Sequence, residues 1–301
     1  MNGSSRLKGF SLQPENKSTR IKLYCWKLIH FSPPLFMENI EIKDASSPGI
    51  RKVSDLLMDV ASLLMSSGAH TARVARNVSR MANAFGYEAT ISIFQLSIMM
   101  SVYDKKNEHQ YITLIRKIKP LALNFSIVSK ISILSWKTID AKLSVKQVRE
   151  EFYEITKTSR FSRWVVLLLV AIANASFCRL FEGDLYAMGF VAIGTFLGLF
   201  VRQEMHHRGA NHFLIFITSA FVASFITSFA IRYNIGATPK TALVTSVLYL
   251  IPGVPLLNSI TDIIEGHVLT GTSRAVNAGA LIVCISLGLL LTMLTLGLDR
   301  L

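Results

Sequence analysis

The chain has 301 residues, a net charge of +13, 51% hydrophobic residues and a mean hydropathy of +0.42, which is high for a soluble protein. This length allows two domains. The charge belongs to the first half: residues 1–163 carry 25 Lys and Arg against 13 Asp and Glu, whereas residues 164–301 carry seven against six. Because the basic residues are spread out rather than gathered into one run, we expect them to face anionic lipid at a cytoplasmic membrane surface and not nucleic acid.

Residues 1–45 show no clear periodicity and are interpreted as a leader. Met37 opens a segment that is more typical of a protein start. We therefore expect residues 1–36 to be either disordered or an extension upstream of the native start.

Residues 46–160 are predicted to form a small, basic α+β domain in the cytoplasm. Apolar side chains recur every three or four residues from Val53 to Leu64, which indicates an amphipathic helix. We expect Gly68 to end this helix and Thr71 to cap the next, which runs to Gly86. Strands are predicted over 88–94, 96–103 and 109–115, and two further helices over 124–140 and 144–158.

Residues 161–301 are predicted to form a transmembrane domain of five helices. About 20 apolar residues cross a bilayer as a helix, and five such runs follow one another here, separated by brief charged loops. The expected fold is therefore an α-helical polytopic membrane domain preceded by a small α+β soluble domain. The five expected spans are Trp164–Phe181, Leu185–Val201, His212–Ile231, Thr241–Ser259 and Ala275–Gly297.

The orientation depends on Lys157, Arg160 and Arg163, which stand just before the first span. Positive charge flanking the first helix usually remains in the cytoplasm. We therefore expect the N-terminal domain inside and the C-terminus outside, although the loops between the later spans carry nearly equal positive charge on the two sides.

The fourth span contains Pro252, Gly253 and Pro255, which should break or kink its helix. A broken backbone is tolerated in lipid only where it faces protein or a water-filled cavity, and transporters use such breaks to bind polar substrates. Asn258 and Asp262 follow at a spacing of four and would share one helical face. Two interpretations remain open here: a substrate path, or a kinked helix that runs into a polar loop.

Other polar positions are less informative. Arg202 and Gln203 could bind an anionic group or anchor the second span at the membrane surface. The pair His206–His207 is expected in a loop without a third metal ligand, and the three cysteines have neither zinc nor disulfide spacing. Gly189, Gly194 and Gly198 are expected to let helices or subunits approach closely.

No arrangement of nucleophile, base and orienting group stands out, nor does a common enzyme motif. We therefore predict that the protein is not an enzyme and uses no metal or cofactor.

The segment Ile251–Arg274 resembles the threonine/serine exporter family, especially its YjjP-type members. Further similarity lies at 163–180, at 202–203 and, more weakly, at Ser67-Gly68-Ala69 and the Arg-rich helix after it. Together these cover about residues 52–297. The family pattern in the fourth-span segment falls on Pro252, Gly253, Pro255, Asn258, Asp262, Gly266, Gly271 and Arg274.

The resemblance implies a multi-pass protein of the bacterial inner membrane that exports threonine, serine or succinate. It also implies a small polytopic partner subunit, because the chain ends right after its fifth span and resembles the split form of the family. From charge and position, we expect Asn258 to hydrogen-bond substrate or to hold the break, Asp262 to bind an ammonium group or a coupling proton, and Arg274 or Arg202 to meet a carboxylate.

The protein could also assemble as a homo-oligomer. Two alternative functions remain. It could be a membrane-anchored sensor with a ligand-binding cytoplasmic domain. It could also be an intramembrane hydrolase, although the missing nucleophile argues against this.

Overall fold

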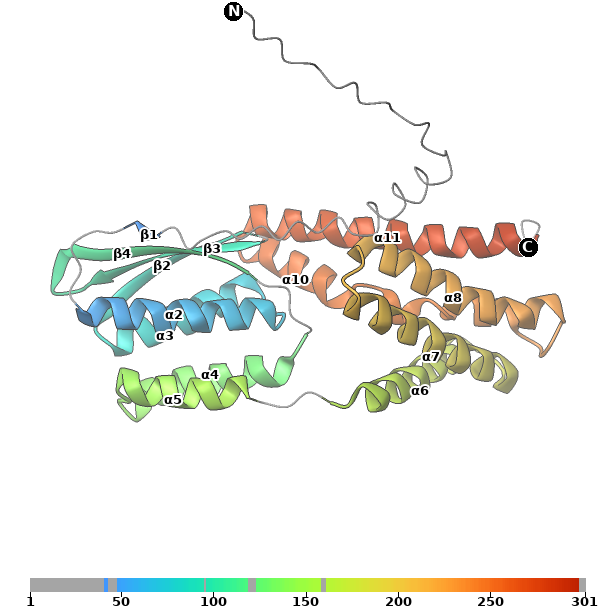
Figure 1. Ribbon diagram of the computed structural model, residues 1–301, viewed down its shortest axis with the longest axis horizontal. Coiled ribbons are helices and arrows are strands. Elements are labelled where there is room, and N and C mark those ends of the chain that lie inside the picture. Colours follow the sequence, from blue (N-terminus) through green and yellow to red (C-terminus); the bar gives the residue numbers. More distant parts are fainter. Residues whose placement is uncertain (1–40, 43–47, 95, 119–122, 158–160, 298–301) are drawn as a thin grey trace, which may run out of the picture.

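The computed structural model describes residues 41–42, 48–94, 96–118, 123–157 and 161–297. Figure 1 shows an elongated molecule in which an N-terminal α+β unit and a bundle of long apolar helices lie end to end. The N-terminal unit runs from β1 to α5, and the helical bundle from α6 to α11.

The N-terminal unit has three layers: a sheet, a middle pair of helices, and an outer helical pair (Figure 1). Within the described residues the sheet is antiparallel in the order β1-β4-β3-β2, with β1 Glu41–Ile42, β2 Tyr87–Ile93, β3 Ser97–Asp104 and β4 Asn107–Lys117. The middle layer holds α2 (Pro48–Ser66) and α3 (Thr71–Ala84), and the outer layer α4 (Phe125–Asp140) and α5 (Val145–Thr156).

The helices and strands of this unit lie close to the predicted ranges, with two differences. Glu41 and Ile42 fall in the segment interpreted as a leader, yet they pair with β4. Residues 1–40 and 43–47 of that segment lie outside the described residues. At the start of α3 the N-cap is His70 rather than Thr71, and no side chain caps this end from within the helix.

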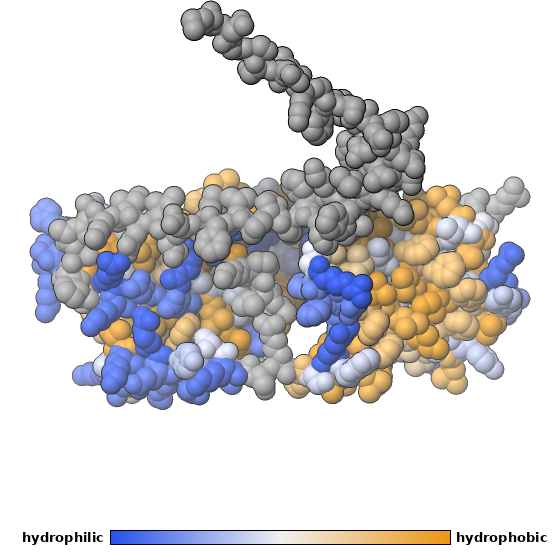
Figure 2. Space-filling view, in the orientation of Figure 1, coloured by the Kyte–Doolittle hydropathy of each residue, from blue (hydrophilic) through white to orange (hydrophobic). Residues whose placement is uncertain are grey.

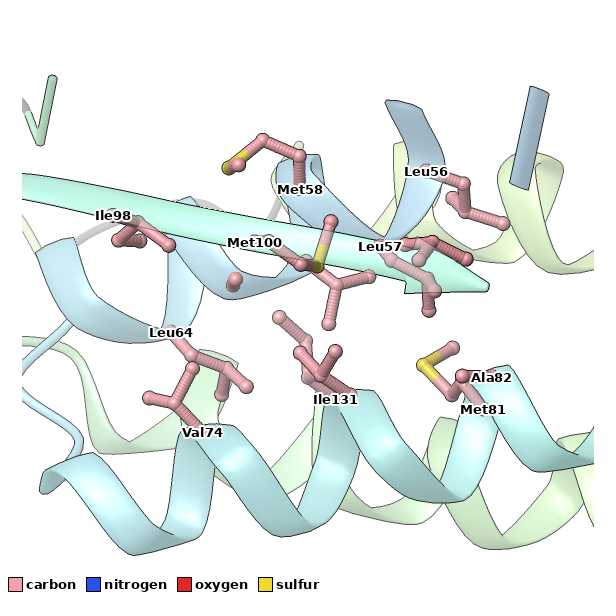
Figure 3. Packing of buried hydrophobic residues seen from close by; sticks show 14 of the residues in the cluster. Leu56, Leu57, Met58, Leu64, Val74, Met81, Ala82, Ile98, Met100 and Ile131 are labelled. Atoms are coloured by element: carbon pink, nitrogen blue, oxygen red, sulfur yellow. The ribbon is translucent and has the colours of Figure 1, made fainter. Parts of the chain in front are cut away.

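One hydrophobic core joins the three layers of this unit. Figure 3 shows side chains of α2, α3, β3 and α4 pointing toward one another. Leu57, Met81, Met100 and Ile131 are fully buried there. Fully burying such a side chain contributes about 1.5–3 kcal/mol, which explains why the periodicity of these segments predicts their position well.

On the face seen in Figure 2 the helical bundle is mostly apolar, whereas the N-terminal unit carries most of the hydrophilic surface. Four described helices are long and apolar enough to cross a membrane, and a fifth crossing results if the bent pair of α9–η1 and α10 counts as one span. The elements are α6 Arg163–Leu180, α7 Leu185–His207, α8 His212–Arg232, α9 Pro239–Thr245, η1 Leu248–Leu250, α10 Gly253–Ile264 and α11 Val268–Leu296.

Two of the expected span boundaries change, and the predicted break in the fourth span is confirmed. The helix α7 continues to its two histidines, so His206 and His207 lie in its last turn and not in a loop. The helix α11 begins at Val268, so Arg274 is helical. The fourth span bends by 59° between η1 and α10. Hydropathy marks where lipid contact ends, whereas a helix can continue into a polar environment as long as its backbone hydrogen bonds are made.

Small residues bring the bundle helices together. A side chain at Gly198 would lie 2.9 Å from the carbonyl oxygen of Ser219 on α8, and one at Gly194 would lie 2.8 Å from that of Ala223. The predicted packing role is confirmed for these two glycines. Gly189 on the same helix faces open space instead.

The first part of α11 projects beyond the other bundle helices. Gly288 lies against Ile217 and Ala220 of α8, and Thr292, one turn later, hydrogen-bonds Ser224. The two helices therefore run parallel, and the start of α8 is level with about residue 281 of α11. The preceding 13 or so residues of α11 extend about 20 Å further toward the N-terminal unit.

The helix α10 packs antiparallel against this extension, and we call α10 together with residues 268–280 the projecting hairpin. Gly266, with φ at +89°, turns the chain between the two helices. Gly271 lets them approach, because a Cβ atom there would lie 2.7 Å from the Ser259 carbonyl oxygen and 2.6 Å from Ile263. In Figure 1 the hairpin lies between the sheet and the bundle.

We predict that Gly271→Leu separates the two helices of the hairpin and lowers the free energy of unfolding by about 1–3 kcal/mol. Thermal unfolding in detergent measures this change. Gly189→Leu is the matched control, since that helical glycine has nothing within 4 Å of its Cβ position. Equal unfolding temperatures for the two variants would contradict the close packing at Gly271.

Candidate functional site at the junction of the two parts

The break in the fourth span places α10 at the junction between the bundle and the N-terminal unit. The short helix η1 ends at Leu250 and α10 starts after Pro252. Pro255 lies in the first turn of α10, where a missing N–H group costs no helical hydrogen bond. The two prolines therefore end one helix and begin the next in a new direction.

Asp262 is fully buried in this junction and both of its carboxylate oxygens are hydrogen-bonded. One oxygen accepts from the backbone N–H of Thr71 at 2.8 Å, and the other accepts from Nη1 of Arg274 at 2.6 Å. The Thr71 N–H belongs to the first turn of α3, whose N-terminus carries partial positive charge. No neighbouring side chain caps the start of α3, and Asp262, 191 residues later in the chain, accepts from the Thr71 N–H instead.

Asn258 lies one turn before Asp262 and faces the same unit. Its side-chain amide donates to the carbonyl oxygen of Gly68 at 2.9 Å. A third link comes from α11, where the hydroxyl of Thr270 donates to the carbonyl oxygen of Ile93 at 2.6 Å. The projecting hairpin is therefore fastened to the N-terminal unit by polar contacts along both of its helices.

Glu265 adds an ionic contact at the tip of the hairpin. Its carboxylate lies 2.9 Å from Nδ1 of His70 and accepts from Nη1 of Arg76 at 3.2 Å. Burial alone would raise the pKa of this carboxyl, but the hydrogen bonds and positive charges of Arg76 and His70 outweigh it and lower the pKa below its ordinary value. Glu265 is therefore ionised at neutral pH.

A cavity of about 280 Å³ opens beside these contacts. The hairpin contributes Pro255, Asn258 and Arg274, while α2 and the turn after it contribute Met65 and Gly68. Among the described residues that line the cavity, Arg274 is the cation, and its Nη2 is 3.6 Å from the sulfur of Met65. The cavity combines apolar walls with an amide and a guanidinium group, the donor set that binds carboxylates.

Arg202 lies elsewhere. Its guanidinium stands over the ring of Phe216 at 4.7 Å, between α7 and α8, and it interacts electrostatically with Tyr249. It does not line the described cavity. The structure thus brings Pro255, Asn258, Asp262 and Arg274 together and leaves Arg202 apart.

His70, Thr71, Arg76 and Glu265 were not predicted to join the site. Nothing in local spacing connects a helix start near residue 71 with a carboxylate at 262, because the contact is formed only by the tertiary fold. The signals for this region were the similarity at Ser67-Gly68-Ala69 and the Arg-rich helix after it, and neither says anything about a partner.

His70, Asp262 and Glu265 could also hold a metal ion by distance, since one ligand atom from each lies within 4.8 Å of the others. Their carboxylate oxygens already accept from Thr71, Arg76 and Arg274. Two guanidinium groups beside the carboxylates oppose a further cation. The cluster is better explained as an ionic contact, and the prediction of no metal stays a prediction.

A family model for threonine/serine exporters matches residues 55–296. The chain belongs to this family. It is 28% identical to the probable succinate transporter subunit YjjP of Klebsiella aerogenes over 82% of the chain and 95% of that protein, and 27% identical to the subunit of the same name from Escherichia coli over 82% and 96%.

A third relative is longer. The chain is 24% identical to the probable threonine/serine exporter of Mycobacterium tuberculosis over 81% of the chain, but this match covers 46% of that exporter. No solved structure matches the chain. The segment Pro252–Arg274, which carries the family pattern, makes up most of the projecting hairpin.

We predict that Asp262→Asn destabilises the junction. The variant keeps an oxygen for the Thr71 N–H but leaves the buried guanidinium of Arg274 without its anion, and breaking such a buried pair costs about 3–5 kcal/mol. The double variant Asp262→Asn with Arg274→Met should recover part of this loss, as a thermal double-mutant cycle can show. Additive losses would mean that the two residues do not interact.

We predict that the contribution of Glu265 depends on pH. Because its pKa is lower in the folded protein than in the unfolded chain, its stabilisation is complete above the unfolded value of about 4.3 and disappears as pH falls through the lower folded value. The difference in unfolding temperature between the native protein and Glu265→Gln should therefore hold from neutral pH to about 5 and shrink below about 4. A difference that stays unchanged down to about pH 3 would contradict this contribution of Glu265.

Proposed function

We propose that the protein is one subunit of an inner-membrane exporter of small carboxylates, either amino acids such as threonine and serine or dicarboxylates such as succinate. The observation that carries the proposal is the cavity at the junction, which lies where the broken fourth span leaves the bundle. The names of the relatives support these substrates. Ligand cavities usually measure about 300–1,000 Å³, so one of about 280 Å³ suits a metabolite of a few carbon atoms.

In this proposal Arg274 binds the substrate carboxylate and Asn258 donates a further hydrogen bond. A guanidinium group can bind a carboxylate through two parallel N–H bonds. Arg274 uses Nη1 for Asp262, and its side chain is 13% exposed. A carboxylate entering the cavity would therefore compete with Asp262 for the same guanidinium.

Asp262 would couple substrate binding to opening of the junction. Protonation of Asp262, or an ammonium group of the substrate beside it, would weaken its bonds to Thr71 and Arg274. The hydroxyl of Thr71 is buried without a hydrogen-bond partner among the described residues, so the site holds a polar group that a rearranged state could satisfy. Release of Asp262 would remove one of the contacts that hold the hairpin at the start of α3, beside those of Glu265.

We further propose that the N-terminal unit lies in the cytoplasm and that a small polytopic membrane protein completes the exporter. The term subunit in the names of two relatives supports a partner. The cavity then opens on the side from which an exporter must load. Arg202, near the same end of the bundle, would be a second cation along the path or an anchor at the membrane surface.

Efflux from proteoliposomes loaded with labelled threonine, serine or succinate, with and without the partner, tests the proposal. We expect Arg274→Lys to reduce efflux at least about tenfold, because lysine keeps the charge but lacks the planar fork. Arg116→Lys, at an ion pair with Asp59 inside the N-terminal unit, should leave efflux unchanged.

Unchanged efflux in Arg274→Lys would remove that residue from the substrate path. A native protein that moves none of the three substrates while its N-terminal unit binds one of them would favour the sensor alternative instead.

A further inference from the structure

An exposed stripe of mostly apolar residues runs along the whole of α11. Its members follow one another at spacings of three, four or seven residues and so share one side of the helix. From Leu269 to Leu294 the stripe is about 38 Å long, longer than the roughly 30 Å of a hydrocarbon core. The exposed members are Leu269, Thr272, Val276, Val283, Leu287, Leu290 and Leu294.

The part of the stripe that exceeds the thickness of a hydrocarbon core lies on the projecting hairpin. Leu269 is 83% exposed and Val276 is 68% exposed, although both precede the level at which α8 begins. The neighbouring Thr270 bonds the β2 carbonyl of Ile93. This part of α11 is therefore level with the polar N-terminal unit.

The helix α10 extends the same surface. Leu257, Ile260 and Ile264 are exposed at spacings of three and four, and Ile264 reaches 79%. They lie on the side of α10 away from Asn258 and Asp262, which face the N-terminal unit. Both helices of the hairpin thus bury a polar side at the junction and expose an apolar side opposite to it.

A bilayer placed around α8 and the part of α11 beside it would not cover this apolar side. The hairpin stands about 20 Å beyond the start of α8, beside the polar N-terminal unit. Contiguous apolar surface outside a bilayer marks a binding surface for another protein. The stripe resumes at Val283 on the part of α11 that lies beside α8, so one elongated occupant can cover both parts.

We propose that the second subunit of the exporter docks on this stripe, with a transmembrane helix that runs along α11 and continues past the bilayer onto the hairpin. This inference rests on the proposed function and names the surface for its partner. The Mycobacterium tuberculosis exporter, of which this chain matches 46%, has a comparable length of further chain that could occupy the surface. Gly279, at the edge of the stripe, has nothing within 4 Å of its Cβ position, so a partner helix can approach closely there.

Docking at this place would couple the partner to the cavity. The hairpin carries Asn258, Asp262 and Arg274 on one side and the stripe on the other, and its helices are in contact through Gly271. A partner that moves the hairpin therefore moves the polar groups of the cavity with it.

Photocrosslinking in native membranes tests the surface. A benzophenone amino acid replaces Leu269 or Val276, and the control position is Ile133 on α4, which is 66% exposed but lies on the N-terminal unit. We expect both stripe positions to crosslink to the same multi-span membrane protein, distinct from this chain, and Ile133 not to do so. Crosslinks to a second copy of the chain, or to lipid alone, would overturn the proposal.

A pair of glycine variants provides the second measurement. Gly279→Leu should reduce the amount of that membrane protein that co-purifies with the chain at least about tenfold, with the unfolding temperature of the chain unchanged. Gly189→Leu on α7, equally open around its Cβ position, should leave co-purification unchanged. Equal co-purification in the two variants would place the partner elsewhere.

The two proposals fail in different ways. Efflux without crosslinks at the stripe would reject the docking surface and keep the exporter. Crosslinks that depend on Gly279, without efflux of any tested substrate, would keep the docking surface and reject the exporter.

Discussion

The carboxylate of Asp262 is fully buried and connects three elements that are distant in sequence. It accepts from the first turn of α3 and from Arg274 of α11, while its own helix α10 follows the broken span. A buried carboxylate is costly unless it is paired and fully hydrogen-bonded. The N-terminus of α3 and the guanidinium group of Arg274 offset that cost. This arrangement, together with the bonds of Asn258, Thr270 and Glu265, holds the N-terminal unit against the hairpin.

The proline-containing break in the fourth span determines where Asp262 lies. A continuous fourth helix would carry Asp262 along the axis of the bundle, whereas the 59° bend after η1 directs α10 to the N-terminal unit. The residues after the break then have two different sides. One side is polar and closes on the cavity, and the other is apolar and exposed. A transporter whose soluble and membrane parts must move together can use such a hairpin as the connection between them.

The helices and strands of the N-terminal unit follow the sequence closely, because their periodicity reports a core that buries one side of each element. The long apolar helices also lie where the sequence predicts them, except at their ends. The contacts of the polar residues were not predicted by the sequence in the same way. Asn258 and Asp262 were expected to face a substrate, and in the structure both face backbone groups of the N-terminal unit. Their proposed part in transport now includes releasing those contacts.

The sequence by itself determined that a polar α+β segment precedes a set of membrane-spanning helices, and that the fourth of these is broken near Pro252. These properties depend on local composition, on helical periodicity and on the missing N–H of proline, all of which are visible in a short window. Only the tertiary structure decided that Thr71 and Glu265 belong to the site and that Arg202 does not line the cavity. Such pairings join residues almost 200 positions apart, and no local pattern records which helix end will meet which carboxylate.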